Sequence, residues 1–304
     1  MRGLTTEIKQ SGDNIGQLPV NLTTAQLRIN PLKYGWNESL LLTDAKIAQL
    51  KSLEIKSIIS VDGFPEFGTY NQTTPDFWNN QNDLDEVIRF ADEISNRYVN
   101  ENNILAYQFM SEPVLIVDGV SLVPSGWGQL NKDIIETIQR NDKKKKIITT
   151  VAPWGLPRNY QNFKPLPYER LIYGAHYYQP HPYTHQGIGD YTDIYAYPAL
   201  INNVLWDKKR IAEELNHLKN FGITNNVQIY IGEFSCVRWA ENSEIYLRDI
   251  INLFDQYNWS WMYWLIDSWH GWNPNYNDSL SENWQDDYIG YTSKRWQLLK
   301  EFIK

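Results

Sequence analysis

Short runs of β-branched and aromatic residues alternate with amphipathic helical patterns along most of the chain, and this alternation constrains the fold more than any other feature. Each run has the length of one strand, and most runs are followed by apolar residues at helical spacing. This arrangement is typical of βα units around a parallel sheet. The alternation therefore predicts an α/β protein.

The pattern predicts seven clear strands and one weaker strand. The clear strands span residues 25–30, 55–61, 104–110, 147–151, 171–177, 227–233 and 260–266, and the weaker one spans 3–7. The predicted helices span residues 44–53, with Thr43 as N-cap, 84–94, 130–139, 209–221, 245–257 and 293–303. Eight strands with helices between most of them favour a (β/α)₈ TIM barrel. No clear helix lies between residues 7 and 25, so we expect an abbreviated first βα unit.

The length of 304 residues fits one large barrel, and we expect a single catalytic domain over residues 1–304. An open doubly wound sheet is the alternative fold. It is disfavoured because no glycine-rich nucleotide-binding turn follows any strand: the stretch Gly126-Trp127-Gly128 lacks the third glycine and opens no βαβ unit.

Composition excludes several classes of function. The 28 basic and 36 acidic residues give a net charge of −8, which disfavours nucleic acid and anionic lipid as partners. The longest apolar stretches are far shorter than the roughly 20 residues that cross a bilayer, so we expect no membrane span. The single cysteine, Cys236, excludes an internal disulfide and a multi-cysteine metal site. Residues 1–6 show no signal peptide.

Aromatic residues make up 14% of the chain, more than a core of this size obviously needs. We expect some of these rings to face a ligand, because the flat apolar faces of indole rings suit stacking against sugars. Six tryptophans lie at or beyond the ends of predicted strands: Trp127, Trp154, Trp264, Trp269, Trp272 and Trp284.

In TIM-barrel enzymes the catalytic groups lie at the carboxyl ends of the strands. Glu112 and Glu233 each follow or end an apolar strand, where a carboxylate is costly unless it has a partner or a task. The alternative is that these carboxylates belong to a structural ion pair. The other candidates at strand ends are Arg28, Asp62, Trp154, His176, Tyr178, Trp264 and Asp267.

A pair of carboxyl groups is the machinery of glycoside cleavage, in which one protonates the leaving oxygen and the other attacks or assists at the anomeric carbon. A carboxylate hydrogen-bonded to Arg28 would be held ionised and would suit the nucleophile. Retention of configuration requires the carboxyl groups about 5 Å apart, and inversion a gap nearer 8 Å.

The strand-end motifs together resemble glycoside hydrolase family 5, the cellulase-like retaining β-glycosidases. Residues 105–113 are similar to the family's fourth strand, which ends in its acid/base glutamate, and residues 229–234 to the seventh strand, which ends in the nucleophile. Residues 176–178 are similar to its His-x-Tyr, residues 27–29 to its second-strand arginine, and residues 261–264 to the eighth-strand tryptophan that floors the cleavage subsite.

The resemblance implies that Glu112 is the acid/base and Glu233 the nucleophile. Arg28, His176 and Tyr178 would orient or tune them, and no cofactor or metal is implied. The substrate-binding residues expected in addition are Ser111, Trp154, Trp264, Trp269 and Trp272. The implied partner is a β-linked oligo- or polysaccharide, β-1,4-glucan first and mannan second, and the implied location is outside the cell.

Two positions depart from the family pattern. Ser111 stands where the family has an asparagine that binds the sugar's 2-hydroxyl, and Asp62 ends the third strand where histidine is common. These departures leave open a non-catalytic or weakly active carbohydrate-binding protein on the same barrel.

Two further chemistries are disfavoured. A metal site formed by His176, His181 and His185 has no cysteine nearby and no helical face, because prolines interrupt the segment. A serine hydrolase is disfavoured because no Gly-x-Ser-x-Gly turn occurs.

Overall fold

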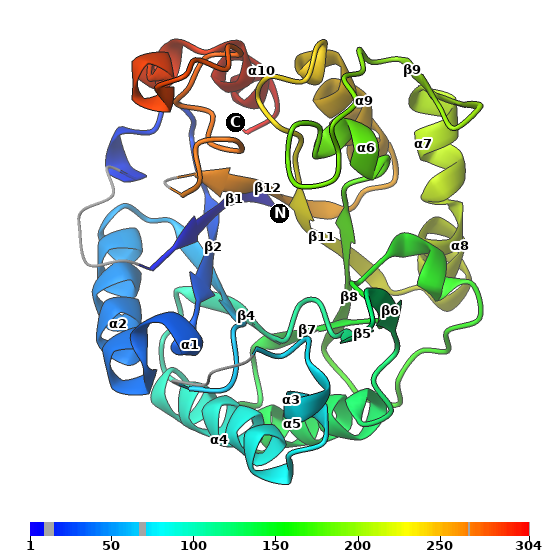
Figure 1. Ribbon diagram of the computed structural model, residues 1–304. Helices are drawn as coiled ribbons and strands as arrows, with labels where there is room; N and C mark the ends of the chain where they lie inside the picture. The colour runs from blue at the N-terminus through cyan, green and yellow to red at the C-terminus, as the bar shows by residue number, and fades with distance from the viewer. Residues whose placement is uncertain (9–14, 67–70, 267, 304) are drawn as a thin grey trace.

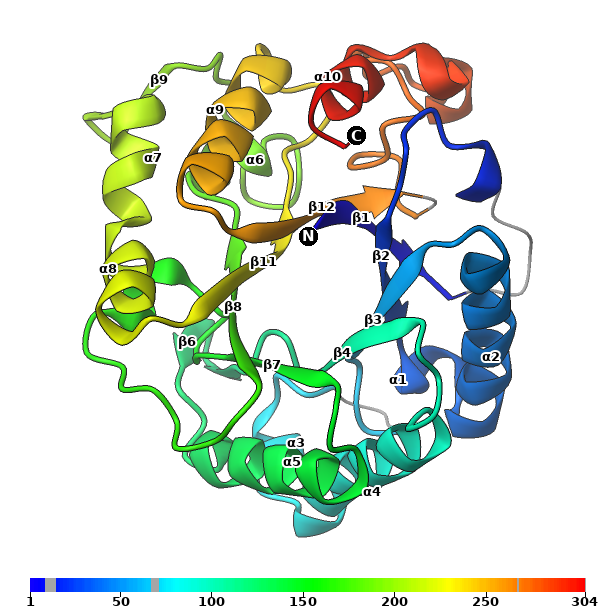
Figure 2. The same ribbon diagram turned by 180° about the vertical axis from the view of Figure 1, so that it is seen from behind.

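The structure is a computed structural model that describes residues 1–8, 15–66, 71–266 and 268–303. Eight parallel strands close into a barrel in the order β1-β12-β11-β8-β7-β4-β3-β2. They are β1 (Arg2–Glu7), β2 (Thr24–Ile29), β3 (Lys56–Val61), β4 (Ile104–Phe109), β7 (Lys146–Thr150), β8 (Leu171–Tyr177), β11 (Gln228–Phe234) and β12 (Ser260–Ile266). Figures 1 and 2 show the ring of strands from its two ends, with the long helices outside it. The predicted (β/α)₈ TIM barrel is confirmed.

The outer layer consists of seven longer helices. They are α2 (Trp36–Ser52), α4 (Gln81–Arg97), α5 (Trp127–Asn141), α7 (Lys208–Glu214), α8 (Asn216–Asn225), α9 (Ser243–Gln256) and α10 (Lys294–Phe302). Shorter helices lie in the loops: α1 (Pro31–Tyr34), α3 (Pro75–Trp78), α6 (His181–Thr184), η1 (Ile15–Gln17), η2 (Pro157–Tyr160), η3 (Trp284–Asp287) and η4 (Gly290–Thr292). In the described part of the chain no helix is long and apolar enough to span a bilayer.

Three predicted elements need correction or comment. The helix predicted from residue 44 begins at Trp36, so Thr43 lies inside α2 and donates its hydroxyl to the Ser39 carbonyl oxygen instead of capping a helix. The helix predicted over 209–221 is two helices, α7 and α8, which meet at Leu215. Between β1 and β2 the described residues form only the 3₁₀ turn η1, so the first βα unit is abbreviated as expected.

Two hairpins were not predicted. They are β5 (Leu115–Val117) with β6 (Val120–Leu122), and β9 (Ala199–Ile201) with β10 (Val204–Trp206). Strands of three residues are too short to give an alternating pattern that can be recognised in a sequence.

Apolar side chains fill the barrel and also join it to the helices. One small cluster contains a buried side chain from each of six strands: Ile58, Ala106, Ile148, Ile172, Tyr230 and Met262. This is the layered filling that makes a TIM barrel a packed core and not a pore. A much larger cluster packs the outer faces of the strands against the helices. The fold thus leaves the loops at the carboxyl ends of the strands free to build a site.

Candidate active site

Strand register brings His176 and Glu233 together. In the β8–β11 pair, Glu233 lies opposite His176, just after an irregularity in register at Gly232. A Cβ atom on Gly232 would lie 3.1 Å from Nε2 of His176, which is tighter than an ordinary contact, so glycine at this position lets the imidazole approach the strand closely. The barrel scaffold therefore positions this pair directly.

The His176 imidazole links the two candidate catalytic carboxyl groups. Its Nδ1 atom lies 2.8 Å from Oε1 of Glu112 and 3.6 Å from Oε2 of Glu233. The Tyr178 hydroxyl donates a hydrogen bond of 3.1 Å to the same Oε2 atom of Glu233. Potential ligand atoms of Glu112, His176 and Glu233 all lie within 4.8 Å of one another. Two carboxyl groups from distant parts of the chain thus face one small volume.

The electrostatics of this cluster are dominated by burial and by mutual charge. Burial raises the pKa of Glu233 to about 7; the Glu112 carboxylate acts in the same direction, while His176 and Arg28 oppose the rise. Burial alone would lower the pKa of His176, but the Glu233 and Glu112 carboxylates outweigh it and raise this pKa to about 9. The imidazole is therefore cationic at neutral pH and lies between two acidic groups.

The two glutamates differ in their access to solvent. The Glu112 side chain is 30% exposed, whereas that of Glu233 is 11% exposed. A general acid/base must exchange protons with water between steps, and a nucleophile need not. The more open position of Glu112 suits the first role.

Arg28 does not form the expected hydrogen bond to the candidate nucleophile. Its Nη1 atom donates to Oε1 of Glu7 at 2.8 Å, and no hydrogen bond joins it to Glu233 within the described residues. The two partners lie opposite each other in the β1–β2 register, so the first strand supplies the acceptor. Arg28 acts on Glu233 only through space, as a charge that lowers its pKa. Its guanidinium also lies 5.0 Å from the ring centre of Trp264.

The two positions that depart from the family pattern contact each other. Oδ1 of Asp62 accepts the backbone N–H of Ser111 at 2.7 Å, and Oδ2 accepts the Ser111 hydroxyl at 3.1 Å. Burial raises the pKa of Asp62, while Arg28 and the Ser111 hydrogen bonds act in the opposite direction. Ser111 precedes Glu112 directly, so this contact fixes the backbone next to a candidate catalytic group.

A cavity of about 340 Å³ opens over this cluster. It is lined by Glu112, Trp154, Leu156, His176, Tyr178, His181, His185, Glu233, Trp264 and Trp272. Acidic groups, imidazoles and three indole rings therefore share one cavity at the carboxyl ends of the strands, where TIM-barrel enzymes hold their active sites.

The remaining tryptophans fall outside this lining. Trp269 lies 5.3 Å from Trp272, centre to centre, and is partly exposed, so it stands next to the cavity. Trp127 is buried in the core at the start of α5, which removes it from the binding candidates. Trp284 stacks on His270. Asp267 lies outside the described residues.

The three histidines weighed as a metal site do not gather into one group. His181 and His185 lie side by side, with ring centres 4.8 Å apart, but His176 belongs to the carboxylate cluster. His185 is packed against Tyr178 and Trp272, so this pair forms part of the cavity wall.

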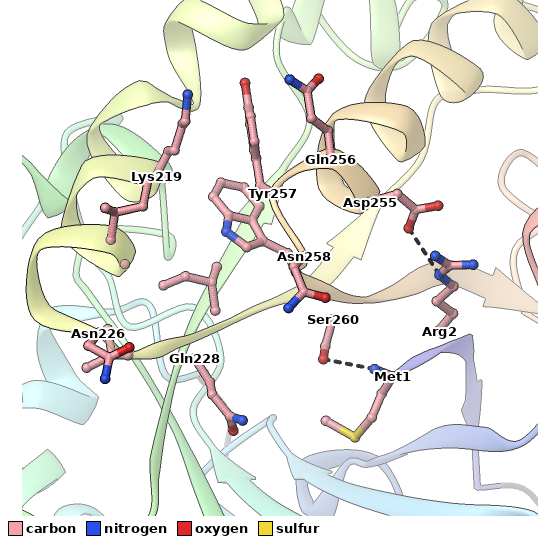
Figure 3. Close-up of a pocket in the computed structure, with 15 residues that line it drawn as sticks. Met1, Arg2, Lys219, Asn226, Gln228, Asp255, Gln256, Tyr257, Asn258 and Ser260 are labelled. Carbon is pink, nitrogen blue, oxygen red and sulfur yellow. Dashed lines mark hydrogen bonds and ion pairs between the residues drawn. The ribbon is translucent and has the colours of Figure 1, made fainter.

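A larger hollow, of about 800 Å³, lies at the other end of the barrel (Figure 3). Residues at the amino ends of strands line it, among them Arg2, Gln228 and Ser260. Its acidic residue, Asp255, is already paired with Arg2 at 3.1 Å. In this fold the amino-terminal face generally serves stability and not catalysis. The smaller cavity with Glu112 and Glu233 is therefore the candidate active site.

Comparison with known proteins identifies the family of the chain. Residues 6–269 match the family model described as "Cellulase (glycosyl hydrolase family 5)". The chain belongs to glycosyl hydrolase family 5. The match spans β1 to the segment after β12 and so includes every catalytic candidate.

The relatives of this chain are distant from it in sequence. Endoglucanase C of Acetivibrio thermocellus is 22% identical over 207 residues, which cover 59% of this chain and 58% of that protein. The matched segment thus spans less than two thirds of this relative.

Solved structures of similar fold include Thermotoga maritima Cel5A in complex with cellobiose. It has a TM-score of 0.72 at 18% identity and covers 98% of this chain and 96% of its own. The same enzyme in complex with mannotriose gives a TM-score of 0.71 at 18% identity, covering 95% of this chain and 96% of its own.

Sequence reasoning missed three residues of the site. Glu7 ends the weakly predicted first strand, and applying the strand-end rule to that strand would have found it. His181 and His185 were weighed only as metal ligands, although their place in a polar loop after a strand was the available signal.

Proposed function

We propose that this family 5 protein is a retaining glycoside hydrolase that cleaves internal β-linked bonds of a polysaccharide, with β-1,4-glucan as the first substrate and mannan as the second. One observation carries the proposal: carboxyl oxygens of Glu112 and Glu233 lie within 4.8 Å of each other in an indole-lined cavity. This spacing suits double displacement, which needs carboxyl groups about 5 Å apart, and leaves no room for the water that an inverting reaction places between them.

In the proposed reaction, the Glu233 carboxylate attacks the anomeric carbon while Glu112 protonates the leaving oxygen. The glycosyl–enzyme ester is then hydrolysed by a water molecule that Glu112, now a carboxylate, deprotonates. The hydrogen bond from Tyr178 holds Oε2 of Glu233 in place. The cationic His176, bound to Glu112, balances the negative charge of the pair. No cofactor takes part in these steps.

The choice of substrate rests on the relatives. The curated relatives are named endoglucanases, and the Thermotoga protein has been crystallised with cellobiose and with mannotriose. The cavity supports a sugar ligand because Trp154, Trp264 and Trp272 offer flat apolar faces. A polymer of this kind is found outside cells, so we propose an extracellular place of action.

The test is a reducing-sugar assay on glucan, mannan and xylan with the wild-type protein and the variants Glu233→Ala and Glu112→Ala. Glu233→Ala should abolish hydrolysis while binding of the polymer persists, and Glu112→Ala should lower kcat by about 10²–10⁴-fold. Glu136→Gln, which changes an exposed glutamate on α5, is the matched control. The anomeric form of the first product, followed by NMR, should be β. Equal activity of wild type and Glu233→Ala would remove Glu233 from the nucleophile role, and no activity in either would favour the carbohydrate-binding alternative.

A further inference from the structure

The backbone turns sharply between β4 and Glu112. Met110, two residues before Glu112, has φ +54°, in the left-handed region that non-glycine residues rarely adopt. Its side chain is fully buried in the core, so the residue cannot relax by swinging outward. A strained residue of this kind persists only where its surroundings hold it, and such residues cluster at functional sites.

Few groups hold the turn. The Met110 N–H donates to the Val61 carbonyl at 2.9 Å and so extends the β3–β4 ladder by one residue. The Met110 carbonyl accepts a hydrogen bond from the Thr150 hydroxyl at 3.4 Å, which is a long contact. Immediately after the turn, Asp62 accepts both the N–H and the hydroxyl of Ser111. The contact to the Ser111 N–H, at 2.7 Å, is the shortest of these, and Asp62 is the group that holds Ser111 at two points.

Asp62 is itself well fixed. Its N–H donates to the Ile29 carbonyl at 3.0 Å, and its Oδ2 atom accepts a further hydrogen bond from Ser60 at 3.2 Å. The residue is buried and lies next to the strand that carries Arg28. A buried carboxylate is costly unless hydrogen bonds compensate it, and here two of the three that it accepts come from Ser111.

We propose that Asp62 is a positioning residue of the active site: by binding Ser111 through both carboxyl oxygens, it holds the left-handed turn at Met110 and so keeps Glu112 aimed at the bond to be cleaved. The inference rests on the proposed function, because it assigns Glu112 the role of proton donor. Asp62 acts through Ser111 and does not itself reach the reacting atoms.

Because Glu112 is proposed as the proton donor, its misplacement can be measured by comparing substrates with different leaving groups. A loss of stability alone would not change the ratio between such substrates. Glycosides with a poor leaving group, such as phenyl β-cellobioside, need a proton from the general acid. In 2,4-dinitrophenyl β-cellobioside the leaving group, 2,4-dinitrophenolate, departs without this proton. A misplaced Glu112 should therefore slow cleavage of the phenyl glycoside and leave cleavage of the dinitrophenyl glycoside nearly unchanged. Asp62→Ala should lower kcat/KM on the phenyl glycoside about 100-fold, as misplacement by about 1 Å can do, with a change of only a few fold in kcat/KM on the dinitrophenyl glycoside. The comparison uses kcat/KM because this ratio reports the first step, whereas kcat also includes hydrolysis of the glycosyl–enzyme ester, in which Glu112 is the base.

Three further variants sharpen the test. Asp62→Asn keeps an oxygen that can accept the Ser111 N–H, so it should restore most of the wild-type ratio between the two substrates. Asp62→Ser is too short to reach Ser111, and it replaces the alanine variant if that one does not fold. Asp142→Asn alters another buried aspartate, which accepts two backbone N–H groups at the far end of α5, and should lower stability while leaving the ratio unchanged.

The outcomes separate the two proposals. A wild-type protein that hydrolyses neither glycoside overturns the proposed function. An active wild type in which Glu112→Gln is selective for the good leaving group, but Asp62→Ala and Asp62→Ser slow both substrates equally or not at all, overturns the positioning role alone. The role is also overturned if Asp62→Asn is as selective as Glu112→Gln, because charge and not hydrogen bonding would then be responsible.

Discussion

The Nδ1 atom of His176 lies 2.8 Å from Oε1 of Glu112, and the same atom is 3.6 Å from Oε2 of Glu233. One imidazole therefore touches one candidate catalytic carboxyl group and stands close to the other. Its positive charge lowers the pKa of Glu233, while the two carboxylates raise its own pKa. The protonation states of the three groups are thus linked, and the activity of the site should depend on pH in a way that reports this linkage.

The first prediction concerns the alkaline limb of the pH profile. The proposed reaction needs one proton on the pair of carboxyl groups, which Glu112 donates while Glu233 is ionised. The Glu112 carboxylate helps to raise the pKa of Glu233 to about 7, so above this pH both groups are ionised and no proton is left to donate. The value of kcat/KM should therefore fall as the pH rises through about 7. Initial rates on a soluble glucan between pH 4 and 9 would measure this limb, and a kcat/KM that rises through pH 7 would contradict the prediction.

The second prediction concerns the charge on His176. The variant His176→Asn places an amide N–H near the position of Nδ1 but removes the positive charge that lowers the pKa of Glu233. The alkaline limb of kcat/KM should therefore move to higher pH, and the rate at pH 8 relative to that at pH 6 should rise. His217→Asn, on α8, is the control and should leave the profile unchanged. An alkaline limb that stays in place in His176→Asn would show that the imidazole charge does not set it.

The third prediction concerns Trp154 as a sugar platform. This residue lines the cavity, and its Nε1 atom donates to the hydroxyl of Ser121 on the β5–β6 hairpin at 2.8 Å, which holds the ring in one orientation. Loss of the ring should raise KM for cello-oligosaccharides about 2- to 10-fold, since aromatic contacts contribute about 0.5–1.5 kcal/mol, and should change kcat little. Kinetics of Trp154→Ala and of the control Trp206→Ala on β10 test this. Equal KM values in wild type and Trp154→Ala would exclude a role in binding.

The periodic pattern was sufficient to predict the barrel because eight strands and their helices repeat one simple arrangement. All seven clear strands and the weak first strand are present within a residue or two of their predicted limits. The strand-end rule also placed Glu112, His176, Tyr178 and Glu233 together, since parallel strands of a barrel all end at the same rim.

The partners of the charged groups could not be predicted in the same way. The sequence offers Arg28 several carboxylates at strand ends, and only the β1–β2 register, with Glu7 opposite Arg28, selects one. The Asp62–Ser111 contact depends likewise on the left-handed turn at Met110. The sequence does not predict this turn, because a methionine gives no indication of a left-handed backbone. The sequence pattern predicts at which end of the barrel a residue lies. Its hydrogen-bond partner at that end depends on strand register and local backbone geometry.

The last prediction concerns the segment after β12, which packs back on the barrel through a buried ion pair. Nη2 of Arg238 lies 2.8 Å from Oδ2 of Asp287, and the two side chains are 1% and 2% exposed. The Ser281 hydroxyl also donates to Oδ1 of Asp287 at 2.6 Å. The hydrogen bonds from Ser281, together with Arg238, lower the pKa of Asp287 to about 2.

Removing the Asp287 charge leaves Arg238 buried without its partner, so Asp287→Asn should lower the free energy of unfolding by about 3–5 kcal/mol at pH 7. A carboxyl group whose pKa is depressed by folding contributes stability above its unfolded-state value of 3.8, and loses it as the pH falls through about 2. The difference between wild type and Asp287→Asn in urea unfolding should therefore shrink between pH 4 and pH 2. Asp286→Asn changes the exposed neighbouring carboxylate and should have little effect at either pH. A penalty for Asp287→Asn that is equal at pH 7 and pH 2 would mean that packing, and not the ion pair, holds this segment on the barrel.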